Sequence, residues 1–244
     1  MPVESPSHLR GRSAIVTGAG RGIGRAIARR LAAAGANVAI AARTADQLAE
    51  TQRCIEPRRA GGGRALAVVA DVTRAEDVDR LVADTMATFG GVNILVNNAG
   101  TAPLATIEQM EPPTFDAILA TNVRSVYLCC RAVWPHMSAA GGGIIVNISS
   151  MSSFDPFAGF AAYGAAKAFV NTYTRGLATE GRERGIRVYA VAPGAVDTVM
   201  LRSAFPNFPQ AKMLAPDDVA EFVESLLAPA CRHAGGQTLV VSNG

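Results

Sequence analysis

Ser13-Ala-Ile-Val-Thr-Gly-Ala-Gly-Arg-Gly-Ile-Gly-Arg-Ala-Ile-Ala-Arg-Arg-Leu31 is the stretch that decides the fold of this 244-residue chain. It begins with a short apolar, β-branched run at residues 14–16, which is typical of a buried strand. Ile23, Ile27 and Leu31 recur later at the spacing of one helix face. Between the two lie the glycines Gly18, Gly20, Gly22 and Gly24. The stretch therefore predicts a strand, a tight glycine turn and a helix.

The glycine turn also predicts an anion site. Glycines let the backbone approach a phosphate, and the free N–H groups and dipole of a helix start favour negative charge. The spacing does not fit G-x-G-x-x-G, because Ile23 takes the third place counted from Gly18. It fits T-G-x-x-x-G-x-G, beginning at Thr17. An ordinary turn is the alternative, but the flanking strand and helix favour phosphate binding.

Composition excludes several other classes of protein. The net charge is +3 and no Lys/Arg block is long enough to indicate nucleic-acid binding. The four cysteines and three histidines lack metal-ligand spacing, so we expect no metal site. We expect no secretion signal and no membrane span, because no apolar run reaches ~18 residues. The chain is therefore expected to be cytoplasmic, with a loose leader at residues 1–10.

Further apolar runs alternate with helical patterns. Strands are expected at 38–42, 65–70, 92–96, 144–148, 187–192 and 237–241. Capping boxes at 44–47 and 73–76 are expected to open two of the helices between them. This alternation predicts an α/β fold: a single doubly wound parallel sheet of about seven strands over residues 11–244. Ligands of such sheets bind at the carboxyl ends of the strands, where Gly18, Arg43, Asp71 and Asn98 fall.

Residues at the end of the second strand favour one form of dinucleotide. A free ribose 2′-hydroxyl usually meets Asp or Glu there, whereas this chain has Ala42 and Arg43. Arg43 and Arg21 would flank a 2′-phosphate, which predicts NADPH/NADP+ as cofactor. The alternative is that both arginines are ordinary solvated side chains.

Tyr163 and Lys167 are the candidate catalytic pair. They are i and i+4 on a helix expected over residues 161–180, so they share a face. Lowering the pKa of a tyrosine from ~10 to near neutrality requires about 4 kcal/mol. A lysine charge about 4–5 Å away supplies roughly 3–4 kcal/mol at an effective dielectric of ~20. An ordinary helical pair is the alternative.

Together these motifs resemble those of the short-chain dehydrogenase/reductase family, and most of all bacterial 3-oxoacyl-thioester reductases. The resemblance covers almost the whole chain and depends on motifs that occur in the family's order: Thr17-Gly-x-x-x-Gly-x-Gly24, Asp71, Asn97-Asn-Ala-Gly100, Asn122, Ser150, Tyr163-x-x-x-Lys167, and Pro193-Gly194 with Thr198. It implies a carbonyl reductase. The same fold run as an alcohol dehydrogenase, or as a non-catalytic NADP sensor, remains an alternative.

The resemblance also assigns roles to residues. Tyr163 would protonate the carbonyl oxygen, and Lys167 would lower its pKa and bind the nicotinamide ribose. Ser150 would hydrogen-bond the substrate oxygen, and Asn122 would hold a water, unless it is a buried structural residue. The residues implied in cofactor binding are Gly18, Gly20, Arg21, Gly22, Ile23, Gly24, Arg43, Asp71, Val72, Asn98, Ala99, Gly100, Tyr163, Lys167, Pro193, Gly194, Val196 and Thr198.

The substrate side is expected to be apolar. Residues 199–213 correspond to the stretch that often forms a lid in the family, and Asp197 before it is expected to be only a polar turn residue. Phenylalanines gather in this stretch and before Tyr163. Together with two serines they give the candidate substrate residues Ser150, Ser152, Phe154, Phe157 and Phe205. The alternative is that these phenylalanines cover the core or a subunit contact. Family members usually assemble as tetramers, so a homotetramer, or a homodimer, is expected.

Overall fold

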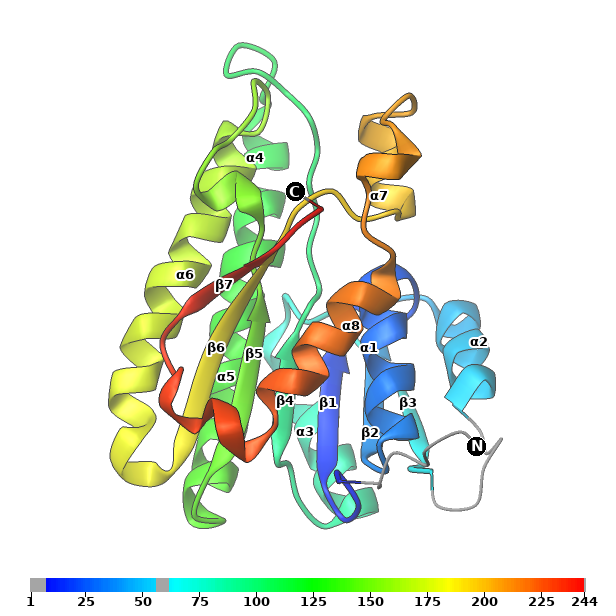
Figure 1. Cartoon of the computed structure of the whole chain (residues 1–244), viewed down its shortest axis with the longest axis vertical. Helices are drawn as coiled ribbons and strands as arrows, with labels where there is room; N and C mark the ends of the chain where they lie inside the picture. The colour runs from blue at the N-terminus through cyan, green and yellow to red at the C-terminus, as the bar shows by residue number, and fades with distance from the viewer. Residues whose placement is uncertain (1–7, 56–61, 244) are drawn as a thin grey trace.

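The computed structural model describes residues 8–55 and 62–243 and contains one parallel sheet of seven strands in the order β3-β2-β1-β4-β5-β6-β7. The predicted doubly wound α/β fold is confirmed (Figure 1). The predicted strands agree with the observed bounds to within two residues. The strands are β1 (Ser13–Thr17), β2 (Asn37–Ala42), β3 (Ala65–Val69), β4 (Ile94–Asn97), β5 (Gly143–Ile148), β6 (Ile186–Pro193) and β7 (Thr238–Val241).

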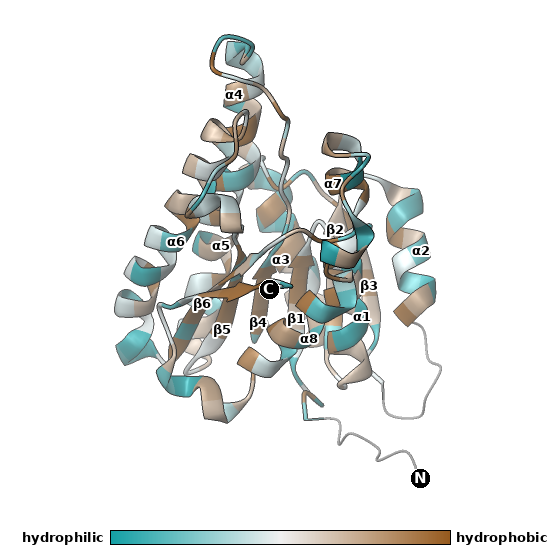
Figure 2. Cartoon of the chain, turned by 45° about the horizontal axis from the view of Figure 1, so that its top comes forward, coloured by the Kyte–Doolittle hydropathy of each residue, from teal (hydrophilic) through white to brown (hydrophobic). Residues whose placement is uncertain are grey.

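Helices cover both faces of the sheet. In Figure 2 the strands form an apolar centre, and the helices around them carry polar residues on their outer sides. Helices α1, α2 and α8 pack on one face, and α3, α5 and α6 pack on the other. The helices are α1 (Gly22–Ala33), α2 (Ala45–Ile55), α3 (Ala75–Phe89), α4 (Pro112–Leu119), α5 (Ser125–Ala139), α6 (Ala161–Gly181), α7 (Val199–Ala204) and α8 (Pro216–Leu226). None within the described ranges is long and apolar enough to cross a membrane.

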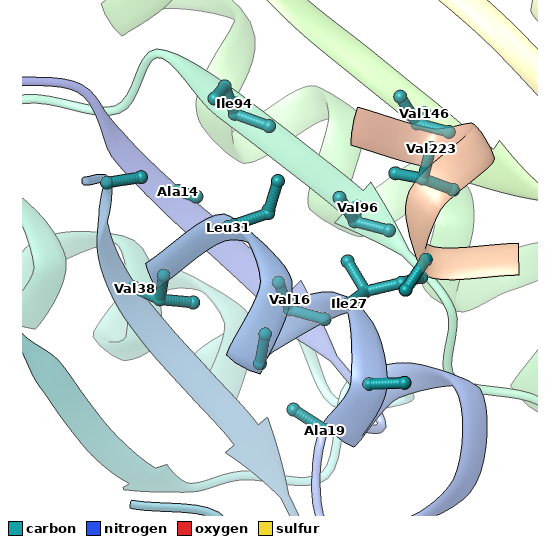
Figure 3. Close-up of a cluster of buried hydrophobic side chains, with 14 of the residues drawn as sticks. Ala14, Val16, Ala19, Ile27, Leu31, Val38, Ile94, Val96, Val146 and Val223 are labelled. Atoms are coloured by element: carbon teal, nitrogen blue, oxygen red, sulfur yellow. The ribbon is translucent and has the colours of Figure 1, made fainter. Parts of the chain in front are cut away.

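The core follows from the alternation of side chains along β1. Val16 lies on the face covered by α1, where it packs in one cluster with Ile27 and Leu31 (Figure 3). Ile15 points to the opposite face and joins the cluster under α3, α5 and α6. Because both faces are buried, the strand is continuously apolar rather than alternating. The helical stripe of the glycine stretch is confirmed, since Ile27 and Leu31 are fully buried.

Three local predictions differ from the structure. The N-cap of α3 is Arg74, without a side-chain capping bond, because the Thr73 hydroxyl donates instead to Asp71 Oδ1 (2.7 Å). Thr44 likewise makes no side-chain capping bond among the described residues; its carbonyl accepts from Leu48. Leu9 is buried in the core, so the predicted loose leader extends too far along the chain. Residues 1–7 of that leader lie outside the described residues.

Candidate active site

The candidate site lies along the edge of the sheet where the strands end. The strand order reverses between β1 and β4, and parallel sheets bind ligands at such a switch point. The glycine turn follows β1 and the Asn97–Gly100 segment follows β4, while Ser149 and Ser150 follow β5. The predicted residues from different parts of the chain are therefore brought to one edge.

The glycine turn forms a cradle that side chains would fill. Gly18 and Gly22 have φ values of 64° and 55°, in the left-handed region that favours glycine. A Cβ on Gly24 would lie 2.3 Å from the carbonyl oxygen of Gly18, so the helix can approach the turn only without a side chain there. Arg21, the N-cap of α1, makes no side-chain capping bond. The first N–H groups of α1 are thus left for an anion, as a diphosphate requires.

Asn98 shapes this cradle from the next strand. Its amide Nδ2 donates to the carbonyl oxygens of Thr17 (3.0 Å) and Gly18 (3.2 Å). The hydroxyl of Thr17 accepts in return from the backbone N–H groups of Asn98 and Ala99, both at 3.1 Å. The Asn98 side chain therefore positions the glycine turn.

Two exposed arginines flank the turn. Arg21 precedes α1 and Arg43 follows β2, and within the described part of the chain neither side chain forms an ion pair or hydrogen bond. Arg25, by contrast, is held by Glu50 and the carbonyl of Gly20. The two guanidinium groups fit a phosphate ligand, because no carboxylate in residues 8–55 and 62–243 pairs with them.

Asp71 and Val72 follow β3, beyond the strands that carry the glycine turn. The carboxylate of Asp71 accepts from the backbone N–H of Thr73 (3.0 Å) as well as from its hydroxyl. Val72 is buried beneath this turn. The bonds hold the Asp71 carboxylate in a fixed orientation at the end of the strand.

Asn122 lies in a short π-helical turn, Ala120–Arg124, which joins α4 to α5. Its Nδ2 donates to the carbonyl oxygens of Thr101 (2.9 Å) and Ile118 (3.0 Å), and it is fully buried. A Cβ on Gly100 would lie 2.8 Å from its Oδ1. A π-turn of this kind is frequent at functional sites. The Asn122 side chain fixes the segment after β4.

Lys167 is buried between α6 and the end of β5. Its Nζ donates to the carbonyl oxygen of Ile148 (2.8 Å) and lies 5.8 Å from the centroid of the Tyr163 ring. Burial lowers the pKa of Lys167 to about 8. The ammonium is therefore mostly charged at neutral pH although it lies in the protein interior.

Tyr163 lies one helical turn before Lys167, next to Ser150. Burial raises its pKa, and a hydrogen bond with Ser150 opposes this rise. The charge of Lys167 does not contribute to this shift, so the expected lowering of the Tyr163 pKa by the lysine is not found. The lysine bonds the backbone of β5 rather than the phenol, and desolvation of the phenolate dominates.

The loop after β6 joins the site to α7. Thr198 caps α7 by accepting from the backbone N–H of Leu201 (3.2 Å), and a Cβ on Gly22 would lie 3.3 Å from its Cγ2. Thr198 is therefore beside the glycine turn. Val196 pairs with Leu214 in an isolated parallel bridge. Pro193 ends β6, and the backbone N–H of the following residue, Gly194, donates to β7 (2.8 Å).

Asp197 is more than the polar turn residue predicted from the sequence. Both of its carboxylate oxygens accept from Arg202, at 2.8 and 3.1 Å. The pKa of Asp197 is held below its usual range by this pair. The C-terminal Asn243 adds a second tie, donating to the carbonyl of Met213 (2.8 Å). Both ends of the 199–213 segment are therefore attached to the sheet edge.

Phenylalanines from the two predicted stretches meet beside Tyr163. The ring of Phe160 lies 5.3 Å from Tyr163 and 5.8 Å from Phe205. Phe157 contacts Phe205 at 6.1 Å, and Phe205 contacts Phe208 at 6.5 Å. Two other candidate substrate residues differ: Phe154 is exposed outside this cluster, and Ser152 is buried, with its N–H donating to Ser150 Oγ. In the described residues, His, Cys, Asp and Glu form no group of three that could hold a metal ion.

The chain is similar over most of its length to known short-chain dehydrogenases and reductases. A family model described as short chain dehydrogenase matches residues 12–208. The 3beta-hydroxysteroid dehydrogenase 1 of Eggerthella lenta is 37% identical over 97% of this chain and 94% of its own. The 3-oxoacyl-(acyl-carrier-protein) reductase of Synechocystis sp. is 36% identical over 97% of both chains. A crystal structure of 3-ketoacyl-(acyl-carrier-protein) reductase from Brucella melitensis complexed with NADH has a TM-score of 0.88 and 36% identity, covering 97% of this chain and 98% of that one.

A dinucleotide-type sheet with a serine, a tyrosine and a lysine gathered at its carboxyl edge defines an oxidoreductase of carbonyl or hydroxyl groups. The chain belongs to the short-chain dehydrogenase family, whose members bind a nicotinamide cofactor. Within it, the chain resembles 3-oxoacyl reductases.

Proposed function

We propose that this chain is an NADPH-dependent carbonyl reductase in which Tyr163 is the general acid. The observation that carries the proposal is the grouping of Tyr163, Ser150 and Lys167 at the strand edge that also holds the glycine turn. A cofactor bound in that turn would bring its nicotinamide toward the same edge. An NADP sensor would not need the three side chains together.

The residues of the chain would handle the proton and orient the substrate. NADPH, when bound, supplies the hydride. Because burial raises the pKa of Tyr163, its phenol is protonated at neutral pH and can donate its proton to the carbonyl oxygen. Ser150 would donate a second hydrogen bond to that oxygen. Lys167 would hydrogen-bond the nicotinamide ribose, since its charge does not lower the pKa of Tyr163.

The preference for NADPH is the finer part of the proposal. Arg21 lies in the glycine turn and Arg43 follows β2; both side chains are exposed and have no partner among the described residues, and β2 ends without an acidic residue. The related Brucella melitensis structure is complexed with NADH, so NADH is the competing cofactor. A 2′-phosphate would satisfy both guanidinium groups, whereas NADH would leave them in solvent.

An apolar carbonyl compound is the substrate we favour, with residues 199–213 acting as a lid. The rings of Phe157, Phe160 and Phe205 join this segment to the loop before Tyr163. The same site can oxidise an alcohol, and nothing in the side-chain geometry sets the direction. Exposed apolar residues on α5 and α6, such as Tyr127 and Phe169, favour a homotetramer or homodimer. We expect it in the cytoplasm.

The test is reduction of a panel of ketones, aldehydes, quinones and 3-oxoacyl thioesters, with Tyr163→Phe as the comparison. The variant keeps the ring but lacks the proton donor, so turnover should fall by ~10²–10⁴. NADPH should still quench or shift the protein fluorescence at the same concentration, because the glycine turn is unchanged. Near-normal turnover in Tyr163→Phe would assign the acid role to another group. Cofactor binding without any turnover in the parent enzyme would favour the sensor.

A further inference from the structure

The residues after β5 form a short loop, Ser149 to Ser153, here named the serine loop, which carries Ser150. It contains the 3₁₀ turn Met151–Ser153 and packs against α6. Ser150 caps that turn, since its hydroxyl oxygen accepts from the backbone N–H of Ser152 (3.2 Å). The orientation of Ser150 therefore depends on how the whole loop is held.

Asn171 of α6 holds the serine loop at both ends. Its Oδ1 accepts from the hydroxyl of Ser149 (2.6 Å), and its Nδ2 donates to the hydroxyl oxygen of Ser153 (2.8 Å). Ser153 in turn donates to the carbonyl oxygen of Ser150 (2.6 Å). The buried amide of Asn171 thus bridges the first and last residues of the serine loop, and through Ser153 it is connected to the backbone of Ser150.

A glycine on the same helix allows the loop to lie close. A Cβ on Gly164 would lie 2.5 Å from the carbonyl oxygen of Ser152 and 2.9 Å from Cβ of Pro156. Gly164 directly follows Tyr163 in the chain. The serine loop therefore packs against the helix turn that carries the tyrosine, and the Asn171 bonds hold it about two turns further along α6.

We infer that Asn171 is a positioning residue: its two hydrogen bonds fasten the serine loop to α6 and so fix Ser150 against Tyr163. The role in turnover rests on the proposed function, whereas the placement of Ser150 does not. The link to chemistry is the hydrogen bond through which Ser150 lowers the pKa of Tyr163. On the described elements around Tyr163, the charged group in reach is Lys167 on the same helix, and it does not contribute to that pKa.

Thr174 provides a matched control on the same helix. It is fully buried three residues after Asn171, and its hydroxyl accepts from Asn147 Nδ2 (2.9 Å), a second bond between α6 and β5. This bond lies beneath the sheet edge and does not touch the serine loop. Thr174→Val removes a buried side-chain hydrogen bond of the same kind without loosening Ser150.

The experiment measures the ionisation of Tyr163 in the full-length chain. Tyrosinate absorbance is followed against pH for each protein, and the absorbance of its Tyr163→Phe counterpart is subtracted to leave the contribution of Tyr163. In Asn171→Ala the pKa of Tyr163 should be higher by about 1 pH unit, because Ser150 no longer holds the phenolate. Ser153→Ala breaks the same link at a half-buried loop residue, tests the inference even if Asn171→Ala does not fold, and should raise the pKa of Tyr163 in the same direction. Thr174→Val should leave the pKa of Tyr163 unchanged.

Kinetics supply the second measurement. With a carbonyl substrate that the parent enzyme reduces, kcat of Asn171→Ala should fall by about 10- to 100-fold, the range expected when a reacting group is misplaced. KM for NADPH should stay near the parent value, and the double variant with Ser153→Ala should fall no further, because both act through one link. No change in the Tyr163 pKa, an equal change in Thr174→Val, or additive losses would overturn the inference. A parent enzyme that reduces no carbonyl would refute the proposed function alone, since the ionisation still reports on Asn171.

Discussion

Replacing Arg43 by alanine should change the choice of cofactor without changing the fold. Arg43 is exposed and has no partner in the described chain, so its loss removes no internal contact. A hydrogen bond to a charged group contributes about 1.5–3 kcal/mol, and an exposed guanidinium belongs at the lower end of that range. This corresponds to about a 10-fold loss in kcat/KM with NADPH. Arg21→Ala should cost a similar factor, and the double variant about 100-fold.

The assay compares kcat/KM for NADPH and NADH in the parent and both single variants at low and high salt. With NADPH the loss should shrink as salt rises, because exposed charges are screened beyond about 10 Å at 0.1 M ionic strength. Arg53→Ala is the matched control: it is an exposed arginine on α2 whose guanidinium, among the described residues, donates to the carbonyl of Ala49 on the same helix. Thermal midpoints of the variants should all match that of the parent.

Two results would refute this reasoning. Equal kcat/KM for the two cofactors in the parent enzyme would mean that no 2′-phosphate site exists. An unchanged value with NADPH in Arg43→Ala, together with a normal value in Arg21→Ala, would mean that the arginines lie outside the cofactor's reach. A loss of similar size with NADH would show that the side chains act on a part of the cofactor that both dinucleotides share.

Other predictions concern stability, substrate and assembly. Because burial lowers the Lys167 pKa to about 8, the folded state releases this proton before the unfolded state does, so the free energy of unfolding should rise with pH between about 8 and 10. At ~1.4 kcal/mol per pKa unit the rise approaches about 3 kcal/mol. Urea titrations of Lys167→Met should show no such rise. If the free energy of unfolding of the parent and of Lys167→Met changed with pH in parallel, the prediction would be wrong. For a series of linear ketones, kcat/KM should rise by up to about four-fold per added methylene, and Phe205→Ala should flatten the rise; a flat series in the parent enzyme would exclude an apolar pocket. Light scattering at micromolar concentration should give the mass of a tetramer or dimer, and a monomer would refute this expectation.

Much of the fold could be predicted because its signals are local. The apolar runs, the glycine turn and the helix periods each depend on residues near one another in the chain. Their agreement with the strand bounds follows from the burial of both faces of a parallel sheet, which makes each strand stand out as an apolar run. The i, i+4 spacing of Tyr163 and Lys167 likewise placed the pair on one face of α6.

Features that depend on competing partners could not be predicted in the same way. Thr73 matches a capping box, yet its hydroxyl donates to the carboxylate of Asp71 instead of capping the helix. The π-turn at Asn122 runs without a break from the end of α4 into the start of α5, so the sequence carries no separate signal for it. Asn171 could have been found: it is a polar residue at i+4 from Lys167, on a face that also carries Tyr163. The direction of the Tyr163 pKa needed the position of the lysine ammonium, which spacing alone does not give.

The bridge between Val196 and Leu214 bears on how this enzyme could change its substrate. Asp197 N–H donates to Leu214 (2.9 Å) and Leu214 N–H donates to Ala195 (2.8 Å), so the intervening segment leaves and returns at one point of the sheet. Such a segment can be exchanged as a cassette, since its ends stay in register whatever lies between them. Doubling the length of a flexible insert costs only about 0.6 kcal/mol in closure entropy. Selection or design could therefore vary the segment between Val196 and Leu214 while the strands that carry Ser150 and the glycine turn remain unaltered.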